Sequence, residues 1–269
     1  MKSSTTAIIV SYKSKWIIEN CIKSIESNTR IIVVENSNDH KLKKSLEKRY
    51  SNLKVIINNN NGFGNGANVG ALQAKTKYLL FLGPDTMLEN KAINNITKIA
   101  KSFNDNFGAI LPINFNETKK TISEVKKSRG ATLIFIRKDI FLKIGLFDEN
   151  FFLYYEDNDL LERLLNEKKK IYEVPIRFQH ACGSHDKKYN EQIEINRHWH
   201  YMWSKFHFYK KKNYFFATLY TFPTLIRCFF RLSINYFFNK KKHLIYKARF
   251  EGLINSYLNK KSWYRPKIN

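Results

Sequence analysis

Short apolar runs and longer amphipathic segments alternate along the first third of the chain. The runs at 7–10, 31–34 and 53–57 are rich in β-branched residues, which is typical of buried strands. Residues 16–27 and 40–50 lie between them and carry apolar side chains at helical spacing. Because strands that alternate with helices usually pair in parallel, this order predicts an α/β fold, a mostly parallel sheet flanked by helices.

The same alternation continues along the chain. It predicts, in order, a helix at 66–75, a strand at 78–82, a helix at 90–103 and strands at 109–113 and 131–136. The stretch 114–128 is polar and predicts a loop. A solvated surface loop is the simpler interpretation, and a mobile border of an acceptor site is the alternative.

Polar residues stand where several of these strands end. Ser11, Glu35 and Asp85 follow buried strands, and Asn61 comes shortly after the strand at 53–57. Ligands of parallel α/β sheets bind at the carboxyl ends of the strands. The sequence therefore predicts a binding site at this edge of the sheet.

The last part of the chain has a different composition. Residues 199–238 are crowded with aromatic side chains, and lysines at 210–212 and 240–242 bracket the apolar stretch 214–238. This stretch has the length of a membrane span, but a proline and two arginines fall inside it. An interfacial helix on anionic lipid is therefore expected. The alternatives are ordinary core helices and a surface for single-stranded nucleic acid.

Charge strengthens this contrast. The chain carries 47 Lys and Arg against 23 Asp and Glu, a formal net charge of +24, which implies attraction to polyanions. From residue 200 onward there are 15 Lys and Arg and a single acid, Glu251. More than half of the excess positive charge therefore lies in the last quarter of the chain.

Cysteine usage indicates a reducing compartment. Cys21, Cys182 and Cys228 are odd in number and widely spaced, unlike the cysteines of a disulfide framework. No secretory signal pattern opens the sequence. We therefore expect a cytoplasmic protein, peripheral on the cytoplasmic face of a membrane.

Several short segments in a fixed order carry a family resemblance. They are Ile-Ile-Val-Ser-Tyr at 8–12, Val-Val-Glu-Asn-Ser at 33–37, Asn-Gly-Phe at 61–63, Phe-Leu-Gly-Pro-Asp at 81–85, and the segment 147–157, which ends in Tyr-Tyr-Glu-Asp. Together they resemble the inverting nucleotide-sugar glycosyltransferases of family 2, especially the rhamnosyltransferase-like branch. The resemblance implies a GT-A-like, Rossmann-type catalytic domain at 1–198, followed by a helical basic extension at 199–269.

The resemblance also implies a donor site. Ser11, Tyr12, Glu35 and Asn36 stand where the family holds the base and ribose, although the family usually has Asp at the Glu35 position. An acid after a strand is otherwise often a helix cap.

The Asn/Gly-rich segment, residues 58–70, resembles a second family pattern, to which Asn61, Gly62, Phe63, Asn68 and Gly70 belong. Its glycines stand at 62, 64, 66 and 70, which is not the spacing of a Rossmann dinucleotide site. A flexible turn before a helix is the alternative interpretation.

Gly83-Pro84-Asp85 stands in place of the family's Asp-x-Asp-like motif. The match implies that Asp85 holds Mg²⁺ or Mn²⁺ at the donor diphosphate, with His180 as a further metal or diphosphate contact. A simple turn is the alternative. Cys182 and His185 lie near His180, but no second Cys/His pair has the spacing of a zinc site.

The segment 154–160 resembles the family's Tyr-x-Glu-Asp-x-Asp-Leu motif. By that match Asp157 is the catalytic base, while Glu156, Asp159 and Arg163 contact the acceptor or orient the site. The rival account is that these acids complement the N-terminus of an amphipathic helix.

The implied activity is inverting transfer of a hexose or deoxyhexose, with rhamnose as one candidate, from a dTDP- or UDP-linked donor. The implied acceptor is a polyprenyl-diphosphate-linked glycan or a growing surface polysaccharide such as an O-antigen, with 199–269 on the anionic membrane. A transferase with a soluble acceptor and a non-catalytic basic binding protein are the alternatives. The ordered family segments weigh against nucleic acid as a partner.

Overall fold

A computed structural model describes residues 3–104, 106–117, 121–181 and 190–265. The chain divides into two compact units, an α/β unit of residues 1–148 and 157–186 and a helical unit of residues 149–156 and 187–269. The expected boundary after residue 198 falls inside helix α7 (Asn190–Lys210), which lies wholly in the helical unit.

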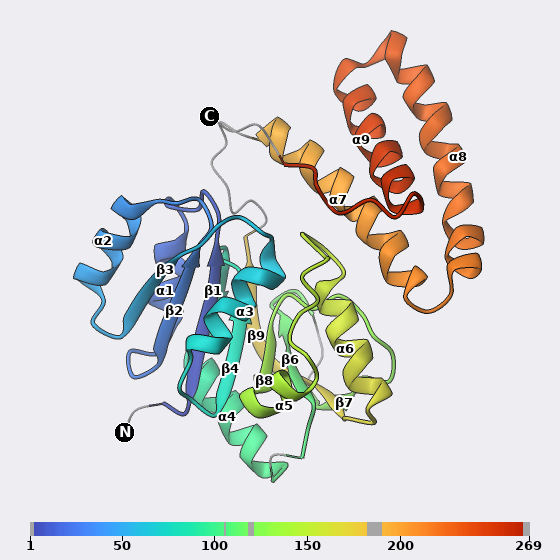
Figure 1. Ribbon diagram of the computed structural model, residues 1–269. Helices are drawn as coiled ribbons and strands as arrows, with labels where there is room; N and C mark the ends of the chain where they lie inside the picture. The colour runs from blue at the N-terminus through green and yellow to red at the C-terminus, as the bar shows by residue number, and fades with distance from the viewer. Residues whose placement is uncertain (1–2, 105, 118–120, 182–189, 266–269) are drawn as a thin grey trace. The chain divides into compact units, whose positions relative to one another are not determined.

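The first half of the sheet follows the sequence pattern closely (Figure 1). It consists of β1 (Thr5–Ser11), β2 (Arg30–Glu35), β3 (Leu53–Ile57) and β4 (Tyr78–Leu82). These strands are parallel and lie in the order β3-β2-β1-β4. The predicted α/β sheet is thus confirmed, with β1 between β2 and β4.

The second half of the sheet is mixed. β8 (Ile134–Arg137) runs antiparallel to β4 and is followed across the sheet by β6 (Ala109–Asn114), β9 (Ile171–His180) and β5 (Thr86–Leu88). A two-residue strand, β7 (Ser123–Glu124), pairs with β9 inside the stretch that was expected to be all loop. β5 and β7 are too short for apolar alternation to appear in the sequence.

Helices cover both faces of the sheet (Figure 1). α1 (Ile18–Ser24), α2 (His40–Arg49) and α4 (Ala92–Ser102) pack on the face that carries the odd-numbered apolar residues of β1. α3 (Phe63–Gln73), α5 (Lys138–Lys143) and α6 (Glu156–Asn166) pack on the even-numbered side. Both faces of β1 are therefore buried, which is why its sequence is a continuous apolar run.

Two glycines let α3 lie directly on the sheet. A Cβ on Gly66 would lie 2.7 Å from Val10 Cγ1, and a Cβ on Gly70 would lie 2.5 Å from Ile8 Cγ2. Both distances are shorter than carbon atoms tolerate without displacement. The absence of a side chain at Gly66 and Gly70 thus permits close contact between α3 and β1.

The helical unit is built from α7, α8 (Tyr214–Phe238) and α9 (Lys240–Tyr257). α8 has the bounds of the apolar stretch in the sequence, and the side chains of Asn213 and Asn239 cap the N-termini of α8 and α9. The buried aromatic residues Trp199 and Phe206 of α7 show that part of the aromatic content forms an ordinary core. None of the described helices is both long enough and apolar enough to cross a bilayer.

Residues 149–156, which lead into α6, pack against α7 within the helical unit. The hydroxyl of Ser204 donates to the carbonyl of Leu153 at 2.9 Å, and the rings of Tyr155 and Tyr201 lie 5.7 Å apart. Tyr154 and Tyr155 both have φ of 69°, a left-handed conformation that costs about 1–3 kcal/mol per non-glycine residue. The contacts with α7 hold this segment in its strained conformation.

The contact between α9 and α7 yields a first prediction. A Cβ on Gly252 would overlap the carbonyl oxygen of Trp199, so Gly252→Ala must push the two helices apart. We expect a loss of about 1–3 kcal/mol in the free energy of unfolding of the helical unit. Intrinsic fluorescence during thermal unfolding measures it, because Trp199, Trp203 and Trp263 lie in this unit.

The matched control is Gly130→Ala, whose new Cβ would lie 3.5 Å from its nearest neighbour, Asp157 Oδ2, an ordinary contact distance. An unchanged fluorescence midpoint for Gly252→Ala would show that the helix packing described above is wrong.

Candidate active site

The ends of β1 and β2 bring the first predicted residues together. Ser11 pairs with Glu35 in the parallel register, and the backbone N–H of Asn36 donates to the carbonyl of Ser11 at 2.8 Å. Ser11, Glu35 and Asn36 are all buried. Tyr12 follows directly and is half-buried, and its carbonyl accepts a hydrogen bond from the Ser14 hydroxyl.

Glu35 is not a helix cap. The N-cap of α2 is Asp39, whose carboxylate accepts from the N–H of Leu42 at 2.8 Å. The carboxylate of Glu35 instead accepts from the N–H of Ser37 at 2.6 Å. Burial raises the pKa of Glu35 above its ordinary value, against the opposing effect of hydrogen bonds from Ser37 and Ser11. The alternative interpretation of this acid as a cap was therefore wrong.

The Asn/Gly-rich segment closes this end of the sheet. The side chain of Asn36 donates to the carbonyl of Gly62 at 3.3 Å and accepts from the side chain of Asn58 at 3.0 Å. Gly62 has φ of 105° and is the N-cap of α3, a conformation that favours glycine. Asn61 is exposed beside it, and the ring of Phe63 stands edge-on to Phe147.

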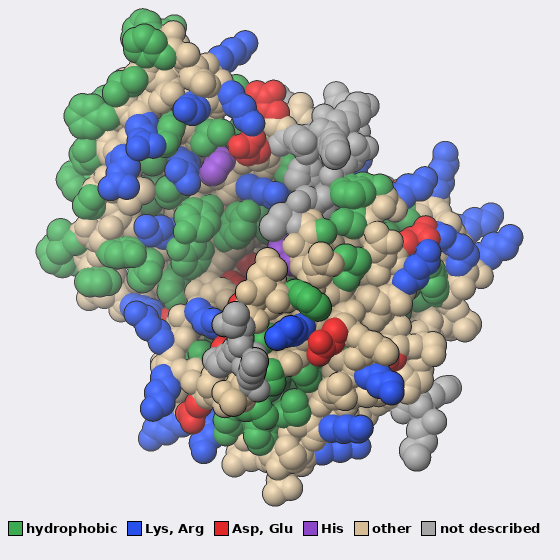
Figure 2. Space-filling view, turned by 180° about the vertical axis from the view of Figure 1, so that it is seen from behind, with side chains coloured by type: hydrophobic (Ala, Val, Ile, Leu, Met, Phe, Trp, Pro, Cys, Tyr) green, Lys and Arg blue, Asp and Glu red, His purple; other side chains and the backbone are tan. Residues whose placement is uncertain are grey.

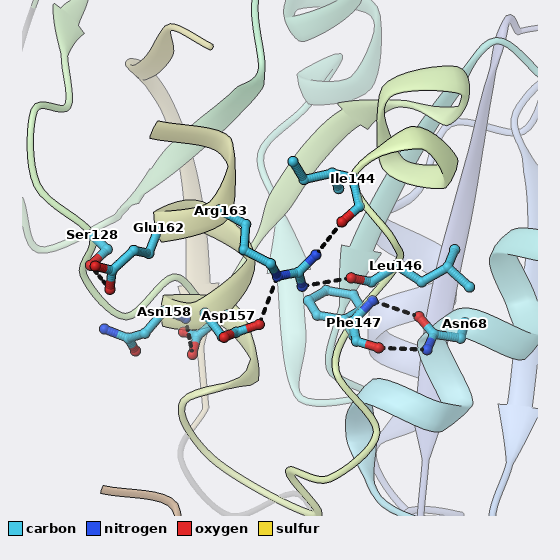
Figure 3. Close-up of polar contacts among 10 residues, drawn as sticks. Asn68, Ser128, Ile144, Leu146, Phe147, Asp157, Asn158, Glu162 and Arg163 are labelled. Atoms are coloured by element: carbon cyan, nitrogen blue, oxygen red, sulfur yellow. Dashed lines mark hydrogen bonds and ion pairs between the residues drawn. The ribbon is translucent and has the colours of Figure 1, made fainter. Parts of the chain in front are cut away.

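Asn68 has a structural contact rather than a place at the strand ends (Figure 3). It is buried in α3, where its side-chain amide donates to the carbonyl of Phe147 and accepts from the N–H of Phe147, both at 3.0 Å. This reciprocal pair fixes the turn before the loop 149–156. We therefore leave Asn68 out of the donor site proposed below.

Arg163 holds the same turn from the other side (Figure 3). Its guanidinium donates to the carbonyls of Ile144 and Leu146 at 2.6 and 2.7 Å and pairs with Asp159 at 2.8 Å. Gly145 and Leu146 both have positive φ, so the turn needs such anchoring. Asp159 and Arg163 thus have orienting contacts, and Glu156 is buried at the start of α6.

Asp85 and His180, the two predicted metal ligands, lie side by side. His180 Nε2 is 3.2 Å from Asp85 Oδ2, because β5 pairs with β9 with Thr86 opposite His180. A carboxylate and an imidazole suit Mn²⁺, and Mg²⁺ commonly completes its shell with substrate phosphates. Among the described residues, no group of three or more His, Cys, Asp or Glu is arranged to hold a metal. Cys182 and His185 lie outside the described residues.

Asp157 lies near the same edge of the sheet. Ile134 of β8 pairs with Phe81 of β4, so residues just before β8 extend past the carboxyl end of β4. There the N–H of Ala131 donates to Asp157 Oδ2 at 2.6 Å, and the N–H of Asn158 donates to Oδ1 at 2.8 Å. Burial raises the pKa of Asp157 despite these bonds, which lower it.

No pattern in the sequence marks the residues that position the Ala131 N–H. Arg129, two residues earlier, forms an ion pair with Glu173 of β9, and Glu173 is buried. This pair ties the loop before β8 to the sheet. Arg129 directly follows the polar stretch 114–128, in which lysine is the commonest residue, so only the contact distinguishes it.

The site differs from the cavity in the α/β unit. That cavity has a volume of about 680 Å³ and is lined by Arg137, Lys143 and Lys169 among others. Arg137 pairs with Tyr78, the first residue of β4, so the cavity lies at the opposite end of the strands from Asp85. We assign it no part in the chemistry.

Comparisons with known proteins agree with this geometry. The profile of the family Glycosyl transferase family 2 matches residues 6–155, more than half of the chain. Rhamnosyltransferase WbbL of Escherichia coli K12 is 22% identical, over 67% of this chain and 84% of that protein. The dTDP-rhamnosyl transferase RfbF of Shigella flexneri is 23% identical, over 68% of this chain and 71% of that protein.

Solved structures share the architecture. A structure of Staphylococcus aureus TarS, residues 1–349, covers 98% of this chain and 93% of its own, with a TM-score of 0.55 and 15% identity. A structure of GalNAc-T7 with UDP, GalNAc and Mn²⁺ covers 65% of this chain and 42% of its own, with a TM-score of 0.57 and 16% identity. At such identity the likeness concerns the fold alone, which is that of GT-A glycosyltransferases.

The expected fold and family are thereby confirmed on independent grounds. The motif segments in the sequence, the polar groups gathered at the strand ends and the family profile all agree. The chain belongs to glycosyl transferase family 2 and is a glycosyltransferase whose relatives include rhamnosyltransferases.

Proposed function

We propose that this protein is an inverting glycosyltransferase that moves a hexose or deoxyhexose, with rhamnose as the leading candidate, from a dTDP- or UDP-linked donor. The acceptor is a hydroxyl of a polyprenyl-diphosphate-linked glycan or growing surface polysaccharide. The observation that carries the proposal is the carboxylate of Asp157, oriented by two backbone N–H groups at the edge where β1, β2 and β4 end. The names of WbbL and RfbF support rhamnose.

The donor nucleoside binds at the ends of β1 and β2. Ser11, Tyr12, Glu35 and Asn36 surround it, and the carboxylate of Glu35 accepts a hydrogen bond from the base. Asn61, Gly62 and Phe63 border the same place, since Asn36 is bonded to Gly62. Burial of Glu35 and Asn36 removes competing water from these contacts.

Asp157 is the catalytic base. It takes the proton of the acceptor hydroxyl as that oxygen attacks the anomeric carbon from the face opposite the diphosphate. The bond from the anomeric carbon to the diphosphate oxygen breaks, its electron pair leaves with the nucleoside diphosphate, and the configuration inverts. Glu156 borders the acceptor, while Asp159 and Arg163 fix the start of α6.

Asp85 and His180 would hold Mg²⁺ or Mn²⁺ against the donor diphosphate. Their separation of 3.2 Å allows both side chains to reach one ion, and substrate phosphates complete the shell. When bound, the ion offsets the negative charge that develops on the leaving diphosphate. The GalNAc-T7 structure, which contains UDP and Mn²⁺, supports this assignment.

The acceptor places the protein at the cytoplasmic face of a membrane. A polyprenyl-diphosphate acceptor is anchored in lipid, so the enzyme must work at that surface. The net positive charge of residues 199–269 suits both anionic lipid and the acceptor diphosphate.

Asp157→Asn tests the base. The amide cannot accept the proton, so we expect kcat to fall by about a hundredfold to ten-thousandfold while donor binding stays near wild type. The thermal midpoint should fall slightly, because the amide nitrogen cannot accept one of the two backbone N–H bonds. The measurement is release of nucleoside diphosphate in the presence of acceptor. The control is Asp139→Asn, which makes the same change at an exposed carboxylate next to the cavity described above.

The pH profile gives a second readout of the same residue. The base works only when deprotonated, so kcat/KM should rise with pH through a pKa above the ordinary Asp value of about 3.9. Full activity of Asp157→Asn would exclude it as the base, whatever the profile.

Arg129→Ala tests how the base is positioned. Loss of the pair with Glu173 frees the loop, weakens the Ala131 N–H bond that lowers the pKa of Asp157, and should move the acid limb of kcat/KM to higher pH. Arg129→Lys keeps a cation for Glu173 and should remain closer to wild type. An unmoved acid limb in Arg129→Ala would leave Arg129 with a role in stability alone.

Asp85→Ala tests the metal and donor site. In the wild type, a dTDP- or UDP-sugar with Mn²⁺ should raise the thermal midpoint, and EDTA should abolish most of the rise. Asp85→Ala should lose the metal-dependent part, and His180→Ala should reduce it. A midpoint shift of equal size with and without metal would contradict the assignment of Asp85 and His180.

A further inference from the structure

α8 has two chemically different sides. Ala217, Thr221 and Cys228 are buried against the rest of the helical unit. The opposite side carries an outward stripe at helical spacing, made of Phe215, Leu219, Phe222, Ile226, Phe230, Ile234 and Phe237. These seven side chains are 42–80% exposed, so the most apolar line of the helix faces outward.

The outward stripe is uncharged along its length. The charged residues of α8 are Arg227 and Arg231, which lie on its flank. Arg231 turns toward α9, where its guanidinium donates to the hydroxyl of Tyr246 at 2.5 Å. The stripe is therefore an apolar surface about six helical turns long, with its nearest cations held to one side.

Cations stand at both ends of the stripe. Lys210, Lys211 and Lys212 precede α8, and Lys240, Lys241 and Lys242 follow it. The segment from 210 to 242 holds eight Lys and Arg and no Asp or Glu. Figure 2 shows hydrophobic side chains gathered along the outer edge of the helical unit, at the upper left, with Lys and Arg side chains beside them.

We propose that α8 lies in the plane of an anionic membrane, with the outward stripe inserted among the acyl chains and the two lysine clusters on the lipid headgroups. The apolar stripe suits the acyl-chain layer of such a membrane, and the cations that flank it suit the anionic headgroup layer. The exposed Tyr220 and Tyr236 of α8 further favour the headgroup boundary, because a tyrosine has an apolar ring and a polar hydroxyl. The inference extends the proposed lipid-linked acceptor, but it rests on this surface alone and holds whichever sugar is transferred.

The positions of the lysines argue against two other binding partners for this apolar helix face, a second copy of the chain and a single-stranded nucleic acid. A second copy packed stripe to stripe would bring like-charged lysine clusters together, which disfavours the pair. Single-stranded nucleic acid needs cations interleaved with aromatic residues along the strand, whereas here the stripe is uncharged and the lysines are at its ends.

Vesicle flotation of the full chain tests the proposal. The wild type should bind phosphatidylcholine vesicles that contain phosphatidylglycerol at least about tenfold more tightly than pure phosphatidylcholine vesicles. The triple variant Leu219→Gln, Ile226→Gln, Phe230→Gln should lose at least about tenfold of the binding to anionic vesicles, because it removes three inserted side chains. Lys240→Gln with Lys242→Gln should reduce the preference for anionic lipid.

Leu72→Gln is the matched control. Leu72 lies in α3 of the α/β unit and is as exposed as the stripe residues, so its variant should bind vesicles like the wild type. Circular dichroism and thermal midpoints verify that each variant is folded. Wild-type binding by the triple variant, or no binding by the wild type, would overturn the proposal.

Analytical sedimentation without lipid measures the oligomeric state and so distinguishes membrane binding from self-association. If the wild type self-associates and the triple variant is monomeric, with no vesicle binding by either, the stripe is an interface between copies and the proposal is wrong. Flotation needs neither donor nor base, so Asp157→Asn should float like the wild type. Failure of the membrane proposal is thereby distinguished from failure of the catalytic one.

Discussion

The parallel pairing of β1 with β2 on one side and β4 on the other is the constraint on which the site depends. It stops three strands at one edge and so brings Ser11, Glu35 and the segment leading to Asp85 together. The pairing depends in turn on burial of both faces of β1, and α3 covers one of these faces only because Gly66 and Gly70 carry no side chain. A methyl group in either place would lift the helix that carries the Asn/Gly-rich segment.

Backbone groups, more than side-chain pairs, fix the side chains that we assign to the site. Asp157 is oriented by two N–H groups, Glu35 by one, and the turn before the loop 149–156 by the side chains of Asn68 and Arg163 bonded to backbone atoms. Such contacts hold a carboxylate in place without bringing an opposite charge beside it, although they too lower its pKa. At Asp157 the effect of burial outweighs that of the two bonds, so its pKa is raised.

The two units would have different parts in the proposed reaction. The α/β unit contains the residues that we assign to donor binding and to the catalytic base. The helical unit contains the outward stripe of α8 and the lysine clusters at its two ends. The helical unit also contains the strained tyrosines 154 and 155, which precede α6 directly in the chain. The segment that leads into α6 therefore belongs to the unit that we propose to lie at the membrane.

The sequence by itself determined the alternation of strands and helices, the strand-end edge and the bounds of α8, because each depends on local periodicity and on composition. β3 and β4 were predicted to the residue, and Asp85 and His180 were paired by family resemblance before the structure placed them 3.2 Å apart. Only the tertiary structure showed the mixed half of the sheet, the contact of Asn68 with Phe147, and the tie from Arg129 to the loop that reaches Asp157. These contacts join residues that are distant in the chain. Strand register and helix packing determine which residues meet, and a local sequence pattern contains no information about either.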